Sequence, residues 1–199
     1  METARQANAN LSWYFTDRLQ NAFSDKNLPQ VSLYGQQLLS LFDLQTAIVS
    51  TDENMLLGTW LEKAKRHGKT PAEKTYFEWN ARVQITLWAN REGAVQLRDY
   101  AAREWQGLLE DYYRPRWESF ISRLEIALLT DTPLETINHY DEELPFVYRK
   151  KEYPTVPSGC LKEAVTAALR AVQACRIIHR EEEGEQDSFE ENVKKTVTL

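Results

Sequence analysis

Apolar side chains recur at intervals of three or four residues along almost the whole of this 199-residue chain. This spacing places them on one side of an α-helix, and the alternating pattern of β-strands is scarce. Only 7 glycines and 7 prolines interrupt it, so the breaks between helices are few. The sequence therefore predicts an all-α fold: a single helical domain of about seven or eight helices.

The breaks divide the chain into predicted helices. The first carries Leu11, Phe15, Leu19 and Phe23 and ends before Pro29. The helices expected after it cover roughly residues 30–48, 55–67, 71–88, 95–114, 115–130, 133–151 and 161–180. We expect the chain to change direction at Pro115, because an internal proline removes a helix hydrogen bond. Residues 153–159, with two prolines, are expected to form an extended connector.

Two short motifs mark predicted helix starts. Thr70 and Thr132 are each followed by a proline and, three residues on, by Glu73 and Glu135 respectively. In such a capping box, the hydroxyl and the carboxylate each accept a hydrogen bond from an unpaired backbone N–H at the helix end. The sequence predicts that both threonines are N-caps.

The charge balance excludes one class of partner. Lys and Arg total 24 against 30 Asp and Glu, a formal net charge of −6, so the basic surface of a nucleic-acid-binding protein is missing. No segment approaches the roughly 20 apolar residues of a membrane helix, and no signal-peptide pattern occurs, so we expect no membrane association. Cys160 and Cys175 fall in one predicted helix, about 22 Å apart, too far for a disulfide. The cysteines therefore do not indicate the cellular compartment of the protein.

The composition changes near the C-terminus. Residues 1–183 are expected to form the helical domain, and no internal repeat divides them. Residues 184–199 form an acidic tail with few apolar side chains. Burial of so little apolar surface does not offset the entropy of ordering a chain, so we expect this tail to be mobile.

Three segments share a distinctive spacing of aromatic, glycine and charged residues. They read LLGTWLE at 56–62, EWNARVQITLW at 78–88 and LRDYAAREWQGLLEDYYRPRWESF at 97–120. Together they resemble the C-terminal helical region of glycoside hydrolase family 89, the α-N-acetylglucosaminidases, in order from about residue 33 to about residue 157. Beyond Gly159 the sequence departs from the family pattern, so no role is implied there.

The resemblance implies an accessory domain that supports a catalytic barrel and shapes the cleft for terminal α-linked N-acetylglucosamine. Enzymes of this family use two carboxylates on a barrel that precedes the helical region, in a retaining mechanism without a metal or organic cofactor. A complete barrel needs roughly 250 residues, and this chain lacks the strand–helix alternation. We therefore assign no catalytic residue and expect no turnover by this chain alone. The family's enzymes are typically secreted, periplasmic or lysosomal.

The chain's own residues offer few other sites. Glu78 and Glu104 each precede a tryptophan, whose apolar surface could raise a carboxyl pKa, but such neighbours are expected by chance among 30 acidic residues. We interpret both as helix-surface carboxylates. The three histidines are too scattered for a metal site, and no phosphate-binding loop or nucleophile motif occurs. The sequence predicts no metal and no cofactor.

The 6 tryptophans and 9 tyrosines suit a saccharide-binding wall, because aromatic faces stack on sugar rings. At helical spacing, however, such side chains usually belong to a core, and we predict this for Trp13, Trp60, Trp105 and Trp117. Trp88 precedes a turn at a predicted helix end, and the resemblance around it implies a cleft wall. Trp88 and Arg82 are therefore the predicted substrate-binding residues. Arg116 is expected to anchor helix packing.

Two functions remain open from the sequence. The leading one is the accessory domain, with the catalytic barrel of a parent enzyme and a glycan ending in N-acetylglucosamine as partners. The alternative is a free-standing helical module that binds carbohydrate or another protein. In the first case, the surface that faces the barrel should expose an unusually large apolar patch, which favours self-association of the isolated chain.

Overall fold

The computed structural model describes residues 1–136 and 138–175, and every regular element within them is a helix. In chain order these are α1 (Glu2–Ser24), α2 (Leu28–Val49), the 3₁₀ turn η1 (Glu53–Met55), α3 (Leu57–Lys65), α4 (Pro71–Gln84), α5 (Arg91–Leu97), the π-helical turn η2 (Leu109–Tyr113), α6 (Arg114–Thr130) and α7 (His139–Tyr148), and a further helix covers residues 161–175. The only β-type pairing in these ranges is an isolated bridge between Leu56 and Gln106. The predicted all-α class is confirmed.

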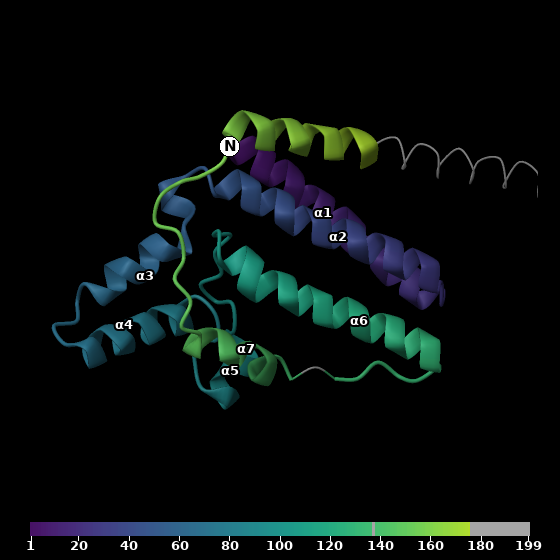
Figure 1. Ribbon diagram of the computed structural model, residues 1–199. Helices are drawn as coiled ribbons and strands as arrows, with labels where there is room; N and C mark the ends of the chain where they lie inside the picture. The colour runs from purple at the N-terminus through teal and green to yellow at the C-terminus, as the bar shows by residue number, and fades with distance from the viewer. Residues whose placement is uncertain (137, 176–199) are drawn as a thin grey trace, which may run out of the picture.

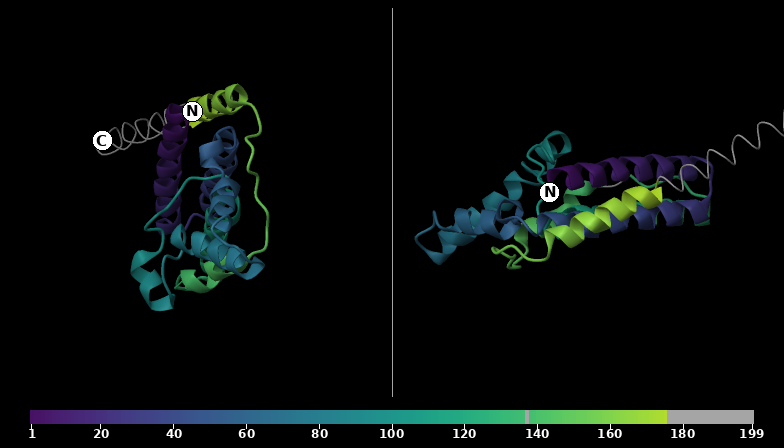
Figure 2. Two further views of the ribbon diagram at one scale, coloured as in Figure 1. Left: turned by 90° about the vertical axis from the view of Figure 1, so that its left-hand side faces the viewer. Right: turned by 90° about the horizontal axis from the view of Figure 1, so that it is seen from above.

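Three long helices form one half of the molecule. Helices α1 and α2 pack together, and α6 packs against α2 (Figure 1). Their shared core includes Leu19, Val31, Leu38 and Leu124. The helix over residues 161–175 lies beside the beginning of α1 (Figure 2), where Ala164 and Ala168 pack with Ala4 and Ile48. The N-terminus is thereby held against the bundle.

The shorter helices α3, α4, α5 and α7 gather at one end of the long ones (Figure 1). They enclose a second core that includes Leu57, Leu61, Leu108 and Phe146. The predicted connector is non-helical: residues 149–160 run from α7 past α3 to the last helix (Figure 1). A Cβ on Gly107, whose φ is +89°, would lie 2.7 Å from the buried ring of Tyr153, so this crossing needs glycine.

The described residues contain no helix long and apolar enough to cross a membrane. Cys160 is exposed and Cys175 is buried. The predicted end of the last helix near residue 180, the domain boundary at 183 and the acidic tail 184–199 lie outside the described residues. They stay predictions.

One of the two predicted helix starts is correct. Thr70 caps α4 with the full reciprocal box to Glu73. The prediction for Thr132 is wrong, since α7 begins at His139, after the N-cap Asn138. The Thr132 N–H donates to the carbonyl of Ala127 as part of the C-terminal end of α6, and its hydroxyl lies 2.7 Å from that of Thr130. The Glu135 carboxylate pairs with Arg123 instead of a helix end.

The predicted change of direction at Pro115 is also wrong. The proline lies in the first turn of α6, directly after the π-helical turn η2, and the helical path is continuous across it. The wider π-turn accommodates a residue without an N–H. The break occurs earlier, between α5 and η2, where Asp99 and Gly107 have positive φ angles. The single helix predicted over residues 95–114 is therefore wrong.

The tryptophan predictions are met in part. Trp60 and Trp105 pack with their rings 5.7 Å apart against the second core, and Trp117 packs against the first, each partly buried. Trp13 is 77% exposed, so its assignment to the core is wrong. The buried side of α1 passes through Leu11, Phe15 and Leu19, which leaves position 13 on the outer side.

Candidate functional site

Trp88 lies in a strained turn after α4. The sequence predicted Trp88 at the end of this helix. The helix instead ends at Gln84, and Trp88 lies four residues further along the chain. The intervening Ile85, Thr86 and Leu87 are all buried. The Trp88 N–H donates to the Val83 carbonyl at 2.8 Å, and Trp88 has a φ of +61°, which is unfavourable for a bulky side chain. The turn leaves the indole 40% exposed.

Tyr100 stands beside Trp88. Their ring centroids are 5.1 Å apart, and Tyr100 is 74% exposed. The Asp99 N–H donates to the Thr86 carbonyl at 2.8 Å, which ties the Tyr100 loop to the Trp88 turn. Val95 is 85% exposed on the intervening α5. Residues 88–100 thus present an exposed aromatic pair and an exposed apolar side chain.

A buried charge cluster holds the Tyr100 loop. Arg116 on α6 donates from Nη1 to Asp99 Oδ2 at 2.6 Å and from Nη2 to Asp99 Oδ1 at 3.1 Å. Its Nε lies 2.6 Å from a carboxylate oxygen of Glu143 on α7, and the Tyr112 hydroxyl donates to Glu143 at 2.6 Å. Because Arg116 joins α6, α7 and the loop, its predicted packing role is confirmed.

The environment of this cluster shifts the pKa of its arginine and of the two tyrosines beside it. Burial alone would lower the pKa of Arg116, but hydrogen bonding to Asp99 and nearby negative charge outweigh it and raise that pKa. Burial, together with the hydrogen bond to Glu143, raises the pKa of Tyr112. Burial also raises the pKa of Tyr113 to about 12. The two tyrosines therefore stay neutral and Arg116 stays charged.

Arg82 occupies a different place. It is 1% exposed, its Nη2 lies 2.6 Å from Glu78 Oε1, and its guanidinium lies over the rings of Phe146 and Tyr153. The side chain thus belongs to the interface of α4 with α7 and the connector, not to the Trp88–Tyr100 pair. These contacts are those of a packing residue, and a role in substrate binding stays a prediction.

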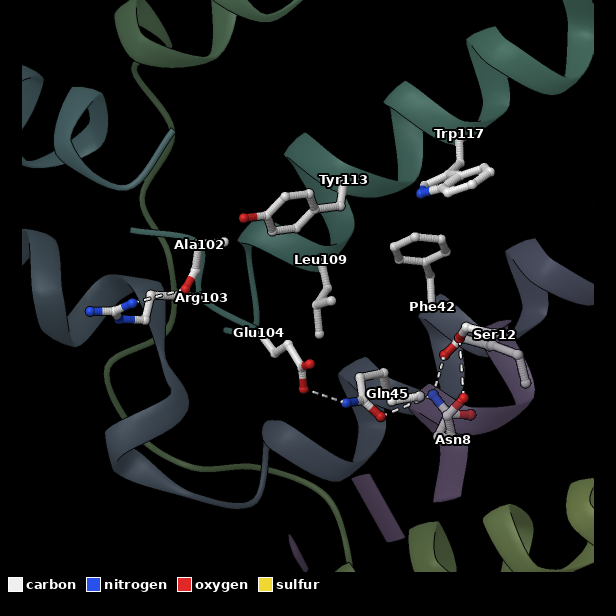
Figure 3. Close-up of a pocket in the computed structure, with 12 residues that line it drawn as sticks. Asn8, Ser12, Phe42, Gln45, Ala102, Arg103, Glu104, Leu109, Tyr113 and Trp117 are labelled. Atoms are coloured by element: carbon white, nitrogen blue, oxygen red, sulfur yellow. Dashed lines mark hydrogen bonds between the residues drawn. The ribbon is translucent and has the colours of Figure 1, made fainter. Parts of the chain in front are cut away.

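Glu104 borders a cavity of about 360 Å³ between α1, α2 and η2, with Phe42 and Trp117 across from it (Figure 3). Its carboxylate accepts hydrogen bonds from Gln45 at 2.8 Å and Arg5 at 2.9 Å. Glu78, by contrast, pairs with Arg82 on α4. Since the two carboxylates occupy separate clusters, each with its own basic partner, they do not form the close pair that glycoside hydrolysis requires.

Sequence reasoning missed Tyr100 and Asp99 as parts of this site. Both lie in the segment 97–120 that carries the family resemblance, but their proximity to Trp88 depends on the loop that folds back onto Thr86. In the described ranges, no group of three or more His, Cys, Asp or Glu side chains is arranged to hold a metal ion.

Comparisons with known proteins agree on one family. The model of the α-N-acetylglucosaminidase (NAGLU) C-terminal domain matches residues 1–171. Human α-N-acetylglucosaminidase is 31% identical over 164 residues, which cover 80% of this chain and 22% of the human protein. A solved family 89 glycoside hydrolase from Clostridium perfringens superposes with a TM-score of 0.80 at 32% identity, covering 85% of this chain and 20% of that one. A structure of the Clostridium perfringens enzyme with its substrate GlcNAc-α-1,4-galactose gives the same TM-score and identity.

Proposed function

This chain belongs to the family of α-N-acetylglucosaminidase C-terminal domains, and we propose that it acts as the helical accessory part of a glycoside hydrolase. It spans about a fifth of the length of the relatives it matches. In this proposal it supports a catalytic barrel and closes one side of the cleft for terminal α-linked N-acetylglucosamine. The catalytic carboxylates come from the barrel, and the chain alone does not turn over substrate.

The exposed Trp88–Tyr100 pair carries the proposal. An aromatic face stacks on the C–H surface of a sugar ring, which makes the pair suitable for a cleft wall. The left-handed backbone at Trp88 costs free energy, and such strain clusters at functional sites. Arg116 on α6 binds Asp99 in the neighbouring loop and Glu143 on α7, and thereby holds the loop in place. The aromatic pair is therefore positioned before a sugar binds.

The apolar character of residues 88–100 favours a partner surface around the aromatic pair. Val95 is 85% exposed and Leu97 is 37% exposed on the same short helix. Contact with a barrel would remove this surface from water. In the isolated chain, the same surface favours self-association.

A chimera tests the cleft role. Residues 1–171 of this chain would replace the matching segment of the Clostridium perfringens enzyme, and hydrolysis of an aryl α-N-acetylglucosaminide would be measured. Trp88→Ala should raise KM or lower kcat/KM roughly tenfold, equivalent to about 1.4 kcal/mol of lost stacking. Trp13→Ala is the matched control, because Trp13 is also exposed but lies on α1.

Thermal unfolding of each chimera separates a local effect from a folding defect. If Trp88→Ala and Trp13→Ala both leave KM and kcat unchanged in a folded chimera, Trp88 does not contact the substrate. A parent barrel that keeps full activity after deletion of its helical segment would favour the alternative, a free-standing binding module.

A further inference from the structure

A second group of aromatic side chains lies away from the Trp88–Tyr100 pair. Tyr76 and Trp79, one turn apart on α4, have ring centroids 5.9 Å apart with an interplanar angle of 31°. Trp79 and Tyr148, the last residue of α7, have centroids 6.4 Å apart with an angle of 38°. We call these three residues the aromatic ladder. It consists of three rings that follow one another across two helices.

The ladder faces solvent to an unusual degree. Tyr76 is 59% exposed and Tyr148 is 64% exposed, while Trp79 between them is partly buried. A folded protein gains free energy by burying aromatic surface, so exposure of adjoining rings indicates a surface that binds something. Neither tyrosine is needed to complete either of the two cores.

A groove of about 420 Å³ adjoins the ladder between α3, α4 and residues 147–153. Trp79 and Tyr148 line it together with the polar side chains of Thr75, Glu78 and Lys150. Its volume lies in the range of roughly 300–1,000 Å³ typical of small-molecule sites. Apolar rings beside hydrogen-bonding groups are the combination that a sugar needs, with C–H faces on one side and hydroxyls on the other.

The charges of the groove favour an uncharged ligand. Its basic side chains are ion-paired within the described residues, with Lys150 as the exception: Lys65 pairs with Glu62, Arg82 with Glu78, and both Arg149 and Lys151 with Asp111. Glu152 also lines the groove next to Lys150 in sequence. With Asp111 included, five cations face four carboxylates, so this surface offers only weak attraction to a polyanion.

We propose that the aromatic ladder and the adjoining groove bind a short stretch of an uncharged oligosaccharide. Successive sugar rings would stack on Tyr76, Trp79 and Tyr148, whose spacing is comparable to the length of a pyranose ring. Glu78 and Lys150 would form hydrogen bonds with the hydroxyl groups at the edge of each sugar ring. The site is separate from the Trp88–Tyr100 pair and does not depend on the proposed cleft role.

Titration of the ¹⁵N-labelled chain with chitohexaose or cellohexaose tests the proposal. The indole N–H signal of Trp79 should shift on addition of at least one of these neutral oligosaccharides, while that of the exposed Trp13 stays in place. Tyr148→Ala and Tyr76→Ala should each weaken binding roughly five- to tenfold, the loss expected for one stacking contact. Tyr148→Trp should restore it.

Trp13→Ala is the matched control, because it removes an exposed aromatic side chain that lies on α1 and has no part in either proposed site. It should leave oligosaccharide binding unchanged, whatever the outcome of the chimera experiment. Exposed substitutions of this kind alter stability little, and circular dichroism checks that each variant is folded. No Trp79 shift with either oligosaccharide, equal binding of dextran sulfate, or loss of binding in Trp13→Ala alone would overturn the proposal.

Discussion

Trp88 combines a left-handed backbone with a large, exposed side chain, and each of these is unfavourable in a folded chain. Its three predecessors in the turn are buried, so the core fixes the path of the chain and leaves position 88 outside. Selection for stability alone would favour glycine or asparagine at such a φ. An aromatic residue there is more readily understood as a binding residue.

The stability of tryptophan variants separates the exposed residue from those in the cores. Trp88→Ala should lower the free energy of unfolding by no more than about 0.5 kcal/mol, as is usual for surface substitutions. Trp105→Ala should cost about 3–5 kcal/mol, since it removes a ring that packs with Trp60. Urea denaturation measures both. Equal losses would mean that Trp88 is a core residue, and the cleft role would lose its physical basis.

Tyr113 should make the protein sensitive to high pH. Burial raises its pKa from 10.0 to about 12 in the folded state. A raised pKa of this kind stabilises the fold fully below pH 10, and the stabilisation is lost as the pH rises from 10 towards 12. Tyr113→Phe should therefore flatten the decline in unfolding free energy between pH 10 and 12, measured by urea denaturation at each pH. Parallel curves for the two proteins would contradict this assignment.

At the scale of elements, local chemistry predicted helix starts only where no tertiary contact competed. Thr70 follows an exposed loop. Its hydroxyl accepts from the Glu73 N–H, and the Glu73 carboxylate accepts from the N–H groups of Thr70 and Lys69, all within the local backbone. Thr132 has the same sequence pattern, but it lies just after the end of α6. Its N–H donates a hydrogen bond to the Ala127 carbonyl in the last turn of that helix. The Glu135 carboxylate forms an ion pair with Arg123 on α6. The pattern was present in both places, and the neighbouring helix decided the outcome.

The three N-cap candidates give a direct test of this explanation. Thr70→Ala should cost about 0.5–2 kcal/mol, because the Glu73 N–H loses its acceptor. Asn138→Ala should cost a similar amount through the Asp141 N–H at the start of α7. Thr132→Ala should cost less than either. Thermal unfolding of the three variants gives the order, and a loss for Thr132→Ala as large as that for Thr70→Ala would contradict the observed start of α7.

At the scale of the whole molecule, helical spacing was enough to predict the class and most helix positions, because burial of one helix side leaves a direct trace in the sequence. The contacts between helices left no such trace. Arg82 and Trp88 are six residues apart in the chain, yet one lies in the α4–α7 interface and the other in a surface turn. The Tyr100 loop is tied to the Trp88 turn by a backbone hydrogen bond from Asp99 to Thr86, which no pattern of side chains encodes.

The separation of acidic side chains across the fold leads to a prediction about activity. A retaining glycosidase needs two carboxyl groups about 5–5.5 Å apart, one of them protonated. In the described residues, Glu78 forms an ion pair with Arg82, whereas Glu104 accepts hydrogen bonds from Arg5 and Gln45. The two carboxylates therefore belong to different clusters. The isolated chain should therefore hydrolyse an aryl α-N-acetylglucosaminide no faster than buffer does. If a purified sample shows turnover that Glu78→Gln or Glu104→Gln abolishes, that residue belongs to an active site, and the accessory role proposed for this chain is wrong.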